Sequence, residues 1–181
     1  MRFAVFPTDF GHQGVVYWTR SELSKAIRIF LPSTESHLRT RIRFEAPDAT
    51  ESTADEVSEL IHRVQRFFQG SQELISMDLV DTTVCTDFQL KVLLAERLIP
   101  YGKTASYTWL ANRVGTRGVR AVGNALATNP FPIVVPCHRA VRSDRTIGKY
   151  QGGSDMKRRI LALEGVGFDA RGRVLCDVFI G

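Results

Sequence analysis

Cys137 is the residue whose immediate neighbours most favour chemistry. It lies in the tetrapeptide Pro136-Cys137-His138-Arg139, directly after the apolar run 131–135. The thiolate is the nucleophilic form of cysteine, and cationic or hydrogen-bonding neighbours lower the pKa of a thiol. An isolated free cysteine is more often a small buried apolar residue. The tetrapeptide alone therefore leaves two interpretations open, a nucleophile or a core residue.

Further short motifs stand on both sides of this tetrapeptide, in a fixed order. They are Phe88-Gln89, residues 99–107 (IPYGKTASY), residues 119–126 (VRAVGNAL), Asn129-Pro130, residues 148–153 (GKYQGG) and Leu163-Glu164-Gly165. Together they closely resemble the O6-alkylguanine-DNA alkyltransferases, also called methylated-DNA–protein-cysteine methyltransferases. The resemblance covers roughly residues 86–166. One four-residue match would be weak, but seven blocks in register, counting residues 136–139, favour the nucleophile interpretation of Cys137.

The resemblance implies DNA repair by direct, irreversible alkyl transfer. A methyl or small alkyl group moves from O6-alkylguanine to Cys137, with O4-alkylthymine as a further candidate substrate. Adjacent side chains usually point apart, so His138 would activate Cys137 through a bridging water, and Glu164 would orient His138. Asn129 would brace the segment that enters the cysteine. A thioether has no easy leaving group, so each molecule is expected to react once.

The alkyl group on a stacked base is out of reach, so the base must be flipped out of the duplex. By resemblance, Arg120 fills the space of the flipped base and Tyr107 presses on its 3′ phosphate. A helix of small residues is expected to enter the minor groove. The residues of this helix that are expected to contact DNA are Ala121, Val122, Gly123 and Ala127. Arg139, which follows His138, is expected to contact DNA as well.

The resemblance also implies a substrate pocket. Tyr150 is expected to donate toward guanine N3, and the pocket is expected to include Gln151, Pro132 and Ala140. Gln151 stands where many family members carry serine or alanine, and Ala140 where valine is common. These two departures leave the range of accepted alkyl groups open.

Two other function classes remain as alternatives. Non-catalytic alkyltransferase-like proteins bind alkylated bases and recruit other repair proteins, but they typically replace the reactive cysteine that Cys137 supplies here. A transcriptional regulator that senses alkylation would need an N-terminal cysteine cluster, and no cysteine precedes Cys85.

Charge is distributed unevenly along the 181 residues. Residues 1–85 carry 9 Lys and Arg against 12 Asp and Glu, whereas residues 86–181 carry 15 against 7. No acidic residue occurs between Glu96 and Asp144. Such a basic region suits a polyanion, because neutralised phosphates release counterions. We therefore expect double-stranded DNA containing O6-alkylguanine as the partner. The alternative is a solvated basic surface without a partner.

Composition excludes several other classes. No apolar run approaches the ~20 residues that span a bilayer, and Pro7 interrupts the start too early for a secretory signal. Cys85, Cys137 and Cys176 are too sparse for a disulfide framework and fit a reducing compartment. No cofactor motif or metal-ligand spacing is present. We expect a cytoplasmic protein (nuclear in a eukaryote), monomeric in solution, without cofactor or metal; cooperative binding along DNA is left open.

The fold class predicted is α/β. An N-terminal α/β domain, residues 1–85, takes a ribonuclease-H-like fold by its position in the family. A mainly α-helical, winged-helix-like DNA-binding domain with a helix-turn-helix, residues 86–181, follows. Residue types predict strands at 15–18, 27–30 and 74–80, loops at 33–38 and 45–53, and an amphipathic helix at 53–68 that opens with a Thr53–Glu56 capping box. In the second half they predict helices at 86–98, 107–113, 119–128 and 156–164, the last capped by Ser154 or Asp155, and a turn at 115–118.

Overall fold

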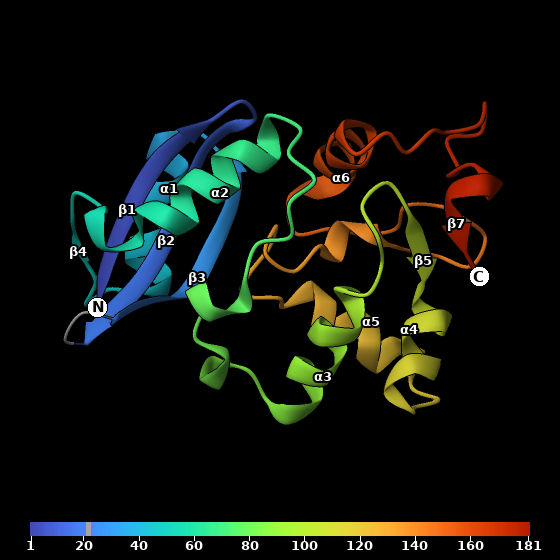
Figure 1. The fold of residues 1–181 in the computed structure, drawn as a ribbon, viewed down its shortest axis with the longest axis horizontal. Helices are drawn as coiled ribbons and strands as arrows, with labels where there is room; N and C mark the ends of the chain where they lie inside the picture. The colour runs from blue at the N-terminus through green and yellow to red at the C-terminus, as the bar shows by residue number, and fades with distance from the viewer. Residues whose placement is uncertain (21–22) are drawn as a thin grey trace. The chain divides into compact units, whose positions relative to one another are not determined.

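The computed structural model describes residues 1–20 and 23–181 of the chain. These residues form two compact units. The first unit comprises Met1–Val84 and Pro130–Val134, and the second comprises Cys85–Asn129 and Val135–Gly181. Within the described residues, no helix has the length and apolar character needed to cross a membrane. The structure is therefore mixed α/β, with a sheet-based first unit and a largely helical second unit (Figure 1).

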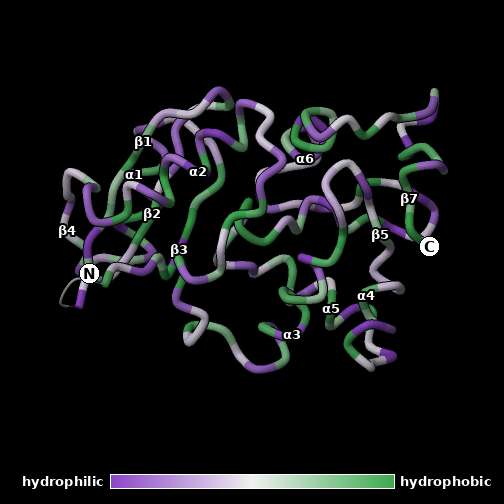
Figure 2. The backbone as a smooth tube through the Cα atoms, in the orientation of Figure 1, coloured by the Kyte–Doolittle hydropathy of each residue, from purple (hydrophilic) through white to green (hydrophobic). Residues whose placement is uncertain are grey.

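A four-stranded sheet organises the first unit. Its strands are β1 (Arg2–Thr8), β2 (Gly11–Arg20), β3 (Leu23–Ser33) and β4 (Thr50–Glu51), in the order β3-β2-β1-β4. β1 pairs antiparallel with β2 and parallel with β4, and β2 pairs antiparallel with β3. The predicted strands at 15–18 and 27–30 lie inside β2 and β3 and are confirmed. Hydrophobic and hydrophilic stretches both occur along these strands (Figure 2), and buried residues are clustered in parts of β2 and β3.

Helices cover both faces of this sheet. Phe3, Val16 and Phe30 share a buried cluster with Leu38 and Ile42 of α1 (Glu35–Glu45). On the opposite side lies α2 (Ser58–Phe68), whose apolar stripe is buried and contacts β1. Figure 1 shows α2 in front of the sheet and α1 behind it. The stripe consists of Leu60, Val64, Phe67 and Phe68.

Two predictions near these helices were wrong. The start of α1 falls in the predicted loop 33–38, because the Thr34 hydroxyl accepts a hydrogen bond from the His37 N–H (3.3 Å) and so starts a helix. The predicted helix at 53–68 begins later, at Ser58, after a 3-10 turn (η1, Asp55–Val57). Thr53 does not cap it, since its hydroxyl donates to the Asp55 carboxylate instead (2.6 Å).

The predicted strand at 74–80 was also wrong. A 3-10 turn, η2 (Met77–Leu79), occupies its centre, and another, η3 (Thr82–Val84), follows. The Ser76 hydroxyl accepts from the Asp78 N–H (3.2 Å), and this local bond competes with strand pairing. Only Val80 forms an isolated bridge, to Ala26. The predicted loop at 45–53 contains the short strand β4.

The second unit combines helices with a small parallel sheet. Its elements are α3 (Asp87–Glu96), β5 (Thr104–Ser106), α4 (Tyr107–Val114), α5 (Val119–Ala127), η4 (Cys137–Arg139), β6 (Ala140–Val141), α6 (Gly153–Leu163), η5 (Cys176–Val178) and β7 (Phe179–Ile180). The sheet has the order β6-β5-β7. α3, α4 and α5 pack against one another.

Side-chain caps start α3 and α4. Thr86 accepts from the Gln89 N–H (3.2 Å) and Ser106 from the Trp109 N–H (2.9 Å). α4 ends at Gly115, whose φ of +73° suits glycine. The predictions of three helices in this region and of the 115–118 turn are confirmed. Phe88, of the Phe88-Gln89 motif, is 39% exposed.

The start of α6 also differs from its prediction. The helix begins at Gly153, three residues before the predicted first residue, 156. Gly152 is the N-cap and provides no side-chain hydrogen bond. Ser154 and Asp155 lie inside the first turn, so neither caps the helix as predicted.

Candidate active site

Cys137 lies at the first position of η4, where the backbone turns tightly. Its N–H donates to the Val135 carbonyl (2.8 Å). The Asn129 side-chain amide donates both to that carbonyl and to the Cys137 Sγ, each at 3.2 Å. The thiol is 4% exposed and the Asn129 side chain is fully buried. Asn129 therefore fixes both the backbone before Cys137 and the sulfur itself.

Burial governs the charge of this thiol. It raises the pKa of Cys137 to about 11, an effect that the Asn129 hydrogen bond opposes. Negative charge on Glu96 raises this pKa further, whereas the Lys157 cation lowers it. In the free protein, the sulfur is therefore a protonated thiol at neutral pH. A proton acceptor is needed before it can act as a nucleophile.

His138 and Glu164 form a buried hydrogen-bonded pair. His138 Nε2 lies 2.8 Å from Glu164 Oε1, and both side chains are buried. Burial lowers the pKa of His138, against the effect of the Glu164 carboxylate, so the imidazole is neutral near pH 7. Burial alone would raise the pKa of Glu164, but His138 and Arg139 outweigh it and lower this pKa to about 2. An ionised carboxylate thus holds a neutral imidazole, an arrangement suited to accepting a proton.

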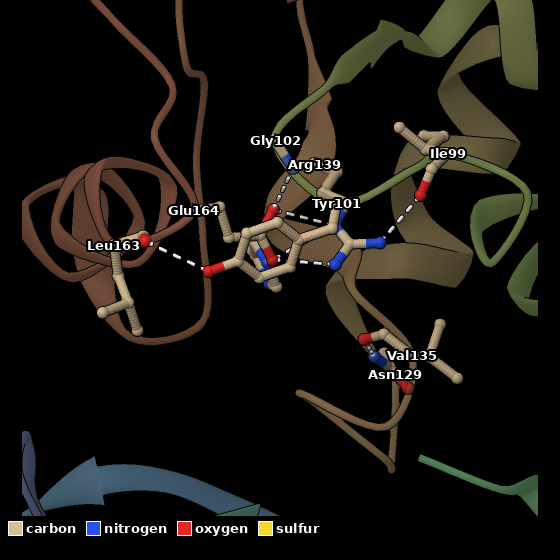
Figure 3. A network of polar contacts seen from close by, with 9 residues as sticks. Ile99, Tyr101, Gly102, Asn129, Val135, Arg139, Leu163 and Glu164 are labelled. Carbon is tan, nitrogen blue, oxygen red and sulfur yellow. Dashed lines mark hydrogen bonds and ion pairs between the residues drawn. The ribbon is translucent and has the colours of Figure 1, made fainter. Parts of the chain in front are cut away.

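Arg139 completes the network around Glu164 (Figure 3). Its Nε donates to Glu164 Oε2 (2.9 Å), its Nη2 to Oε1 (2.8 Å) and its Nη1 to the Ile99 carbonyl (2.7 Å). The Gly102 N–H also donates to Oε2 (3.3 Å). Tyr101 lies against the guanidinium, whose Cζ is 5.7 Å from the ring centroid.

The prediction that Arg139 contacts DNA was therefore wrong. Its side chain is 5% exposed, and three of its nitrogens donate to Glu164 or Ile99. A guanidinium held in this way by a buried carboxylate is not available to a phosphate.

A pocket of about 730 Å³ opens onto the thiol. Residues from α4, α5, η4 and the 148–151 loop surround it: Tyr107, Val119, Arg120, Gly123, Asn124, Leu126, Ala127, Cys137, Arg142, Gly148, Lys149, Tyr150 and Gln151. This volume suits a bound purine with a small substituent. Sequence reasoning missed Asn124 and Arg142 as residues that line the pocket. Only the acid-free basic stretch pointed toward Arg142.

Two predicted pocket residues do not line it. Pro132 is buried in the segment Pro130–Val134, which belongs to the first unit. Ala140 is fully buried in β6, where it pairs with Ala105 and its carbonyl accepts from the Lys157 amine. Cys137, three residues earlier, lines the pocket, but the side chain of Ala140 is packed in the core.

Tyr107 and Tyr150 contribute phenols to the pocket. Burial, with smaller contributions from Glu96 and Cys137, raises the pKa of Tyr107 to about 12. Burial raises the pKa of Tyr150 well above its ordinary value, with Cys137 adding to the effect. Both phenols therefore keep their protons and can act as hydrogen-bond donors to a bound base.

Gln151 links the pocket loop to the end of α5. Its side-chain amide donates to the carbonyls of Ala127 (2.7 Å) and Asn129 (3.1 Å). The backbone of the loop turns at Gly148, whose φ is +66°. The side chain of Gln151 thus ties the loop carrying Tyr150 to the segment carrying Asn129.

The outer face of α5 carries the remaining predicted residues. Arg120, Ala121 and Ala127 are exposed, and Gly123 is partly exposed. Val122 is fully buried with Ala125 and Leu126 in the apolar stripe of the helix, so it does not contact DNA as predicted. No group of three or more His, Cys, Asp or Glu side chains in the described residues is arranged to hold a metal ion.

Comparison with known proteins agrees with this site. Residues 87–166 match the family model described as the DNA-binding domain of 6-O-methylguanine DNA methyltransferase. A methylated-DNA–protein-cysteine methyltransferase of Methanothermobacter thermautotrophicus is 37% identical over 115 residues, 64% of this chain and 65% of that protein. One from Methanosarcina acetivorans is 34% identical over 71% of this chain and 81% of that protein. One from Mycobacterium bovis is 37% identical over 73% of this chain and 81% of that protein.

Solved structures resemble the whole fold. The crystal structure of Mycobacterium tuberculosis OGT in complex with DNA matches with a TM-score of 0.72 and 26% identity, over 91% of this chain and 92% of that one. The O6-methylguanine-DNA methyltransferase of Pyrococcus kodakaraensis also matches with a TM-score of 0.72 and 26% identity, over 91% and 99%.

Proposed function

Because the chain belongs to the family of methylated-DNA–protein-cysteine methyltransferases, we propose that it repairs DNA by moving an alkyl group from guanine O6 onto Cys137. The observation that carries this proposal is the position of the thiol. It is buried, it accepts a hydrogen bond from Asn129, and it faces a pocket with room for a purine, beside a His138–Glu164 pair. A buried cysteine with only a packing role would not need an aligned imidazole and carboxylate.

The reaction is a displacement at a saturated carbon. The thiol proton passes to His138 through a bridging water, and Glu164 stabilises the resulting imidazolium. The sulfur then forms a bond to the alkyl carbon as the bond from that carbon to O6 breaks. The leaving guanine takes up a proton and the His138 imidazolium gives one up to water, so the imidazole is neutral again and the products are a thioether and neutral guanine. Tyr150 donates a hydrogen bond to the base as negative charge develops on it. The thioether is stable, so each molecule reacts once.

The outer face of α5 presents the DNA-binding residues. Arg120 enters the space left by the flipped base, and Tyr107 contacts the neighbouring phosphate. Ala121, Gly123 and Ala127 are small and lie on the exposed side of the helix, which lets its backbone approach the minor groove. α4, the turn at 115–118 and α5 then act as a helix-turn-helix.

Finer features of the fold are also part of this proposal. The order β3-β2-β1-β4, with β4 parallel to β1, supports a ribonuclease-H-like first domain over residues 1–85. Residues 86–181 form the alkyltransferase domain, with a winged-helix-like arrangement of α4, α5 and the small sheet. The protein acts as a monomer. Its relatives come from bacteria and archaea, in which chromosomal DNA lies in the cytoplasm, and we place its activity there.

Intact-protein mass spectrometry tests the proposal. The protein is incubated with a duplex containing one O6-methylguanine and with a matched duplex containing guanine. We expect a mass gain equal to one CH2 group with the methylated duplex alone, and peptide mapping should locate it at Cys137. Cys137→Ala should show no gain while retaining affinity for the duplex, because the thiol is not part of the DNA-binding face.

Cys85→Ala is the matched control, since Cys85 is a second cysteine of the same unit and does not line the pocket. It should gain the methyl group as the wild type does. Tight, lesion-selective binding without any mass gain would instead identify a non-catalytic lesion-binding protein, and a gain at Cys85 or Cys176 would contradict the assignment of the nucleophile.

A further inference from the structure

Two buried charged side chains next to Cys137 have no part in the mechanism above. Glu96 lies at the end of α3 and Lys157 in α6, and both side chains are fully buried. α3 and α6 each pack against η4, the turn that carries Cys137. Buried charges are costly unless they are paired. Because Glu96 and Lys157 are buried on helices that contact the turn carrying Cys137, we considered their effect on the thiol.

The backbone of Ala140 connects these two side chains. Lys157 Nζ donates to the Ala140 carbonyl (2.6 Å) and lies 6.0 Å from the ring centroid of Tyr107 and 5.8 Å from that of Tyr150. Within the described residues, neither Glu96 oxygen accepts a hydrogen bond of ordinary geometry. The Ala140 N–H is nevertheless close enough to lower the pKa of Glu96. Lys157 and Glu96 thus both lie next to the backbone of Ala140, the residue immediately after η4.

Both charges act on the thiol, in opposite directions. The Lys157 cation lowers the pKa of Cys137, and the Glu96 carboxylate raises it. Glu96 also interacts with Tyr107, Tyr150 and Arg139. The other charged groups that face Lys157 are Arg142 and His138.

Burial brings both groups close to neutral pH. It raises the pKa of Glu96 to about 8, against the effects of Lys157 and Arg139. It lowers the pKa of Lys157 to about 8. Near pH 7, Glu96 is therefore mostly protonated and Lys157 mostly charged. Above pH 8 the carboxylate appears and the ammonium is lost.

We propose that Glu96 is a positioning residue that controls the reactivity of Cys137. Protonated Glu96 leaves the Lys157 cation free to stabilise the thiolate, whereas ionised Glu96 disfavours the thiolate through its own negative charge. The inference rests on the proposed function, because it concerns the thiolate formed during alkyl transfer. Lys157 stabilises that thiolate and holds its position through the Ala140 carbonyl. Above pH 8 the negative charge of Glu96 opposes the thiolate while the Lys157 cation is lost, so alkyl transfer slows at alkaline pH, where an ordinary thiol would react faster.

The test is a pH profile of the single-turnover alkyl-transfer rate with an O6-methylguanine duplex, from about pH 6 to about pH 9.5. Glu96→Gln keeps the shape of the side chain and removes its ionisation. It should match the wild type at pH 6 and react about tenfold faster at pH 9, since one unit of thiol pKa is a tenfold change in thiolate. Lys157→Met should react about tenfold more slowly at pH 7. Asp87→Asn, an exposed carboxylate on the same helix as Glu96, is the matched control and should follow the wild type.

Parallel profiles for Glu96→Gln and the wild type would overturn the inference while leaving the proposed function intact. Failure of the wild type itself to gain a methyl group would instead remove the proposed function. Should Glu96→Gln not fold, carbon-13 NMR of the wild type decides the question. A Glu96 carboxyl that titrates near pH 8 supports the inference, and one that titrates near its ordinary value of 4.5 overturns it.

Discussion

The second unit holds charged residues in two contrasting environments. Glu164 is buried with His138 and Arg139, and each of these groups is tied to the others by short hydrogen bonds. Arg120 and Lys149, at the rim of the pocket, are exposed, and neither forms an ion pair within the described part of the chain. The buried charges are fixed before any substrate arrives. The exposed cations can meet phosphates without first breaking a bond.

This contrast separates chemistry from binding. A buried carboxylate can set the protonation of a neighbouring imidazole because no water competes with it. Surface cations contribute to affinity through the counterions they displace, and that contribution falls as salt rises. Variants in the buried set should therefore change stability and transfer together, and variants in the exposed set should change DNA interactions with the fold intact.

Glu164→Gln should have the largest effect, because it leaves Arg139 buried without its counter-charge. Breaking such a buried pair costs about 3–5 kcal/mol of unfolding free energy, and alkyl transfer should fall with it. Urea denaturation followed by circular dichroism measures the stability. Glu59→Gln, which removes an exposed partner of Arg63, is the matched control and should cause little change. Equal losses in the two variants would remove the distinction between the buried and exposed charges.

The same contact makes the wild type sensitive to acid. The folded-state pKa of Glu164, about 2, lies below its ordinary value of 4.5, so its stabilisation is present above pH 4.5 and lost as pH falls toward 2. His138 adds to this loss, because its pKa is also lowered on folding and the unfolded chain binds a proton first, below about pH 6.5. Denaturation at a series of pH values should show this decline, and Glu164→Gln should lack the part below pH 4.5.

Arg120→Ala should have an intermediate effect that is confined to DNA. Without a side chain to fill the space of the flipped base, transfer from a duplex should slow about tenfold to a hundredfold, because extrusion costs a few kcal/mol. Thermal stability should stay the same, since Arg120 is exposed. Arg117→Ala removes an equal, exposed charge in the preceding turn and controls for general electrostatics. If both variants slow transfer equally, Arg120 acts only through its charge.

Ser106→Ala should have the smallest effect of the three. It removes the cap of α4, the helix that carries Tyr107, and caps contribute about 1 kcal/mol. Thermal denaturation should show this modest loss, with a small decrease in duplex affinity. Thr108→Ala, at an exposed position of the same helix, should be nearly neutral. If Ser106→Ala lost as much stability as Glu164→Gln, the exposed DNA-binding face and the buried charges would not be energetically separate.

The sequence predicted the second unit better than the first, for local physical reasons. Thr86, Ser106 and Gly115 are capping signals that act within one turn, so the helix bounds they mark agree with the structure. α1 was missed because only Leu38 and Ile42 are buried along its eleven residues, too few for a clear period. The segment around Ser76 has the composition of a strand, but side-chain hydrogen bonds turn it instead.

Within the site, residue types were predictable and their exposure was not. The motifs identified Cys137, His138 and Glu164, and the structure brings His138 and Glu164 into contact. Arg139 belongs to the same motif as Cys137, yet a motif does not tell which side of the chain faces solvent, and its guanidinium points into the core. The burial of Lys157 was predictable, because its spacing places it on the same face of α6 as Ile160 and Leu161. No pattern in the sequence predicted that Glu96 is buried.

The high pKa of the buried thiol also bears on the lifetime of the unused protein. Peroxides and electrophiles attack thiolates much faster than thiols, so a neutral sulfur that is 4% exposed is shielded from wasteful damage. Cys176, which is exposed, is more open to oxidants. Because each molecule can transfer only one alkyl group, a thiol that reacts slowly with other reagents preserves the protein for a base bound in the pocket.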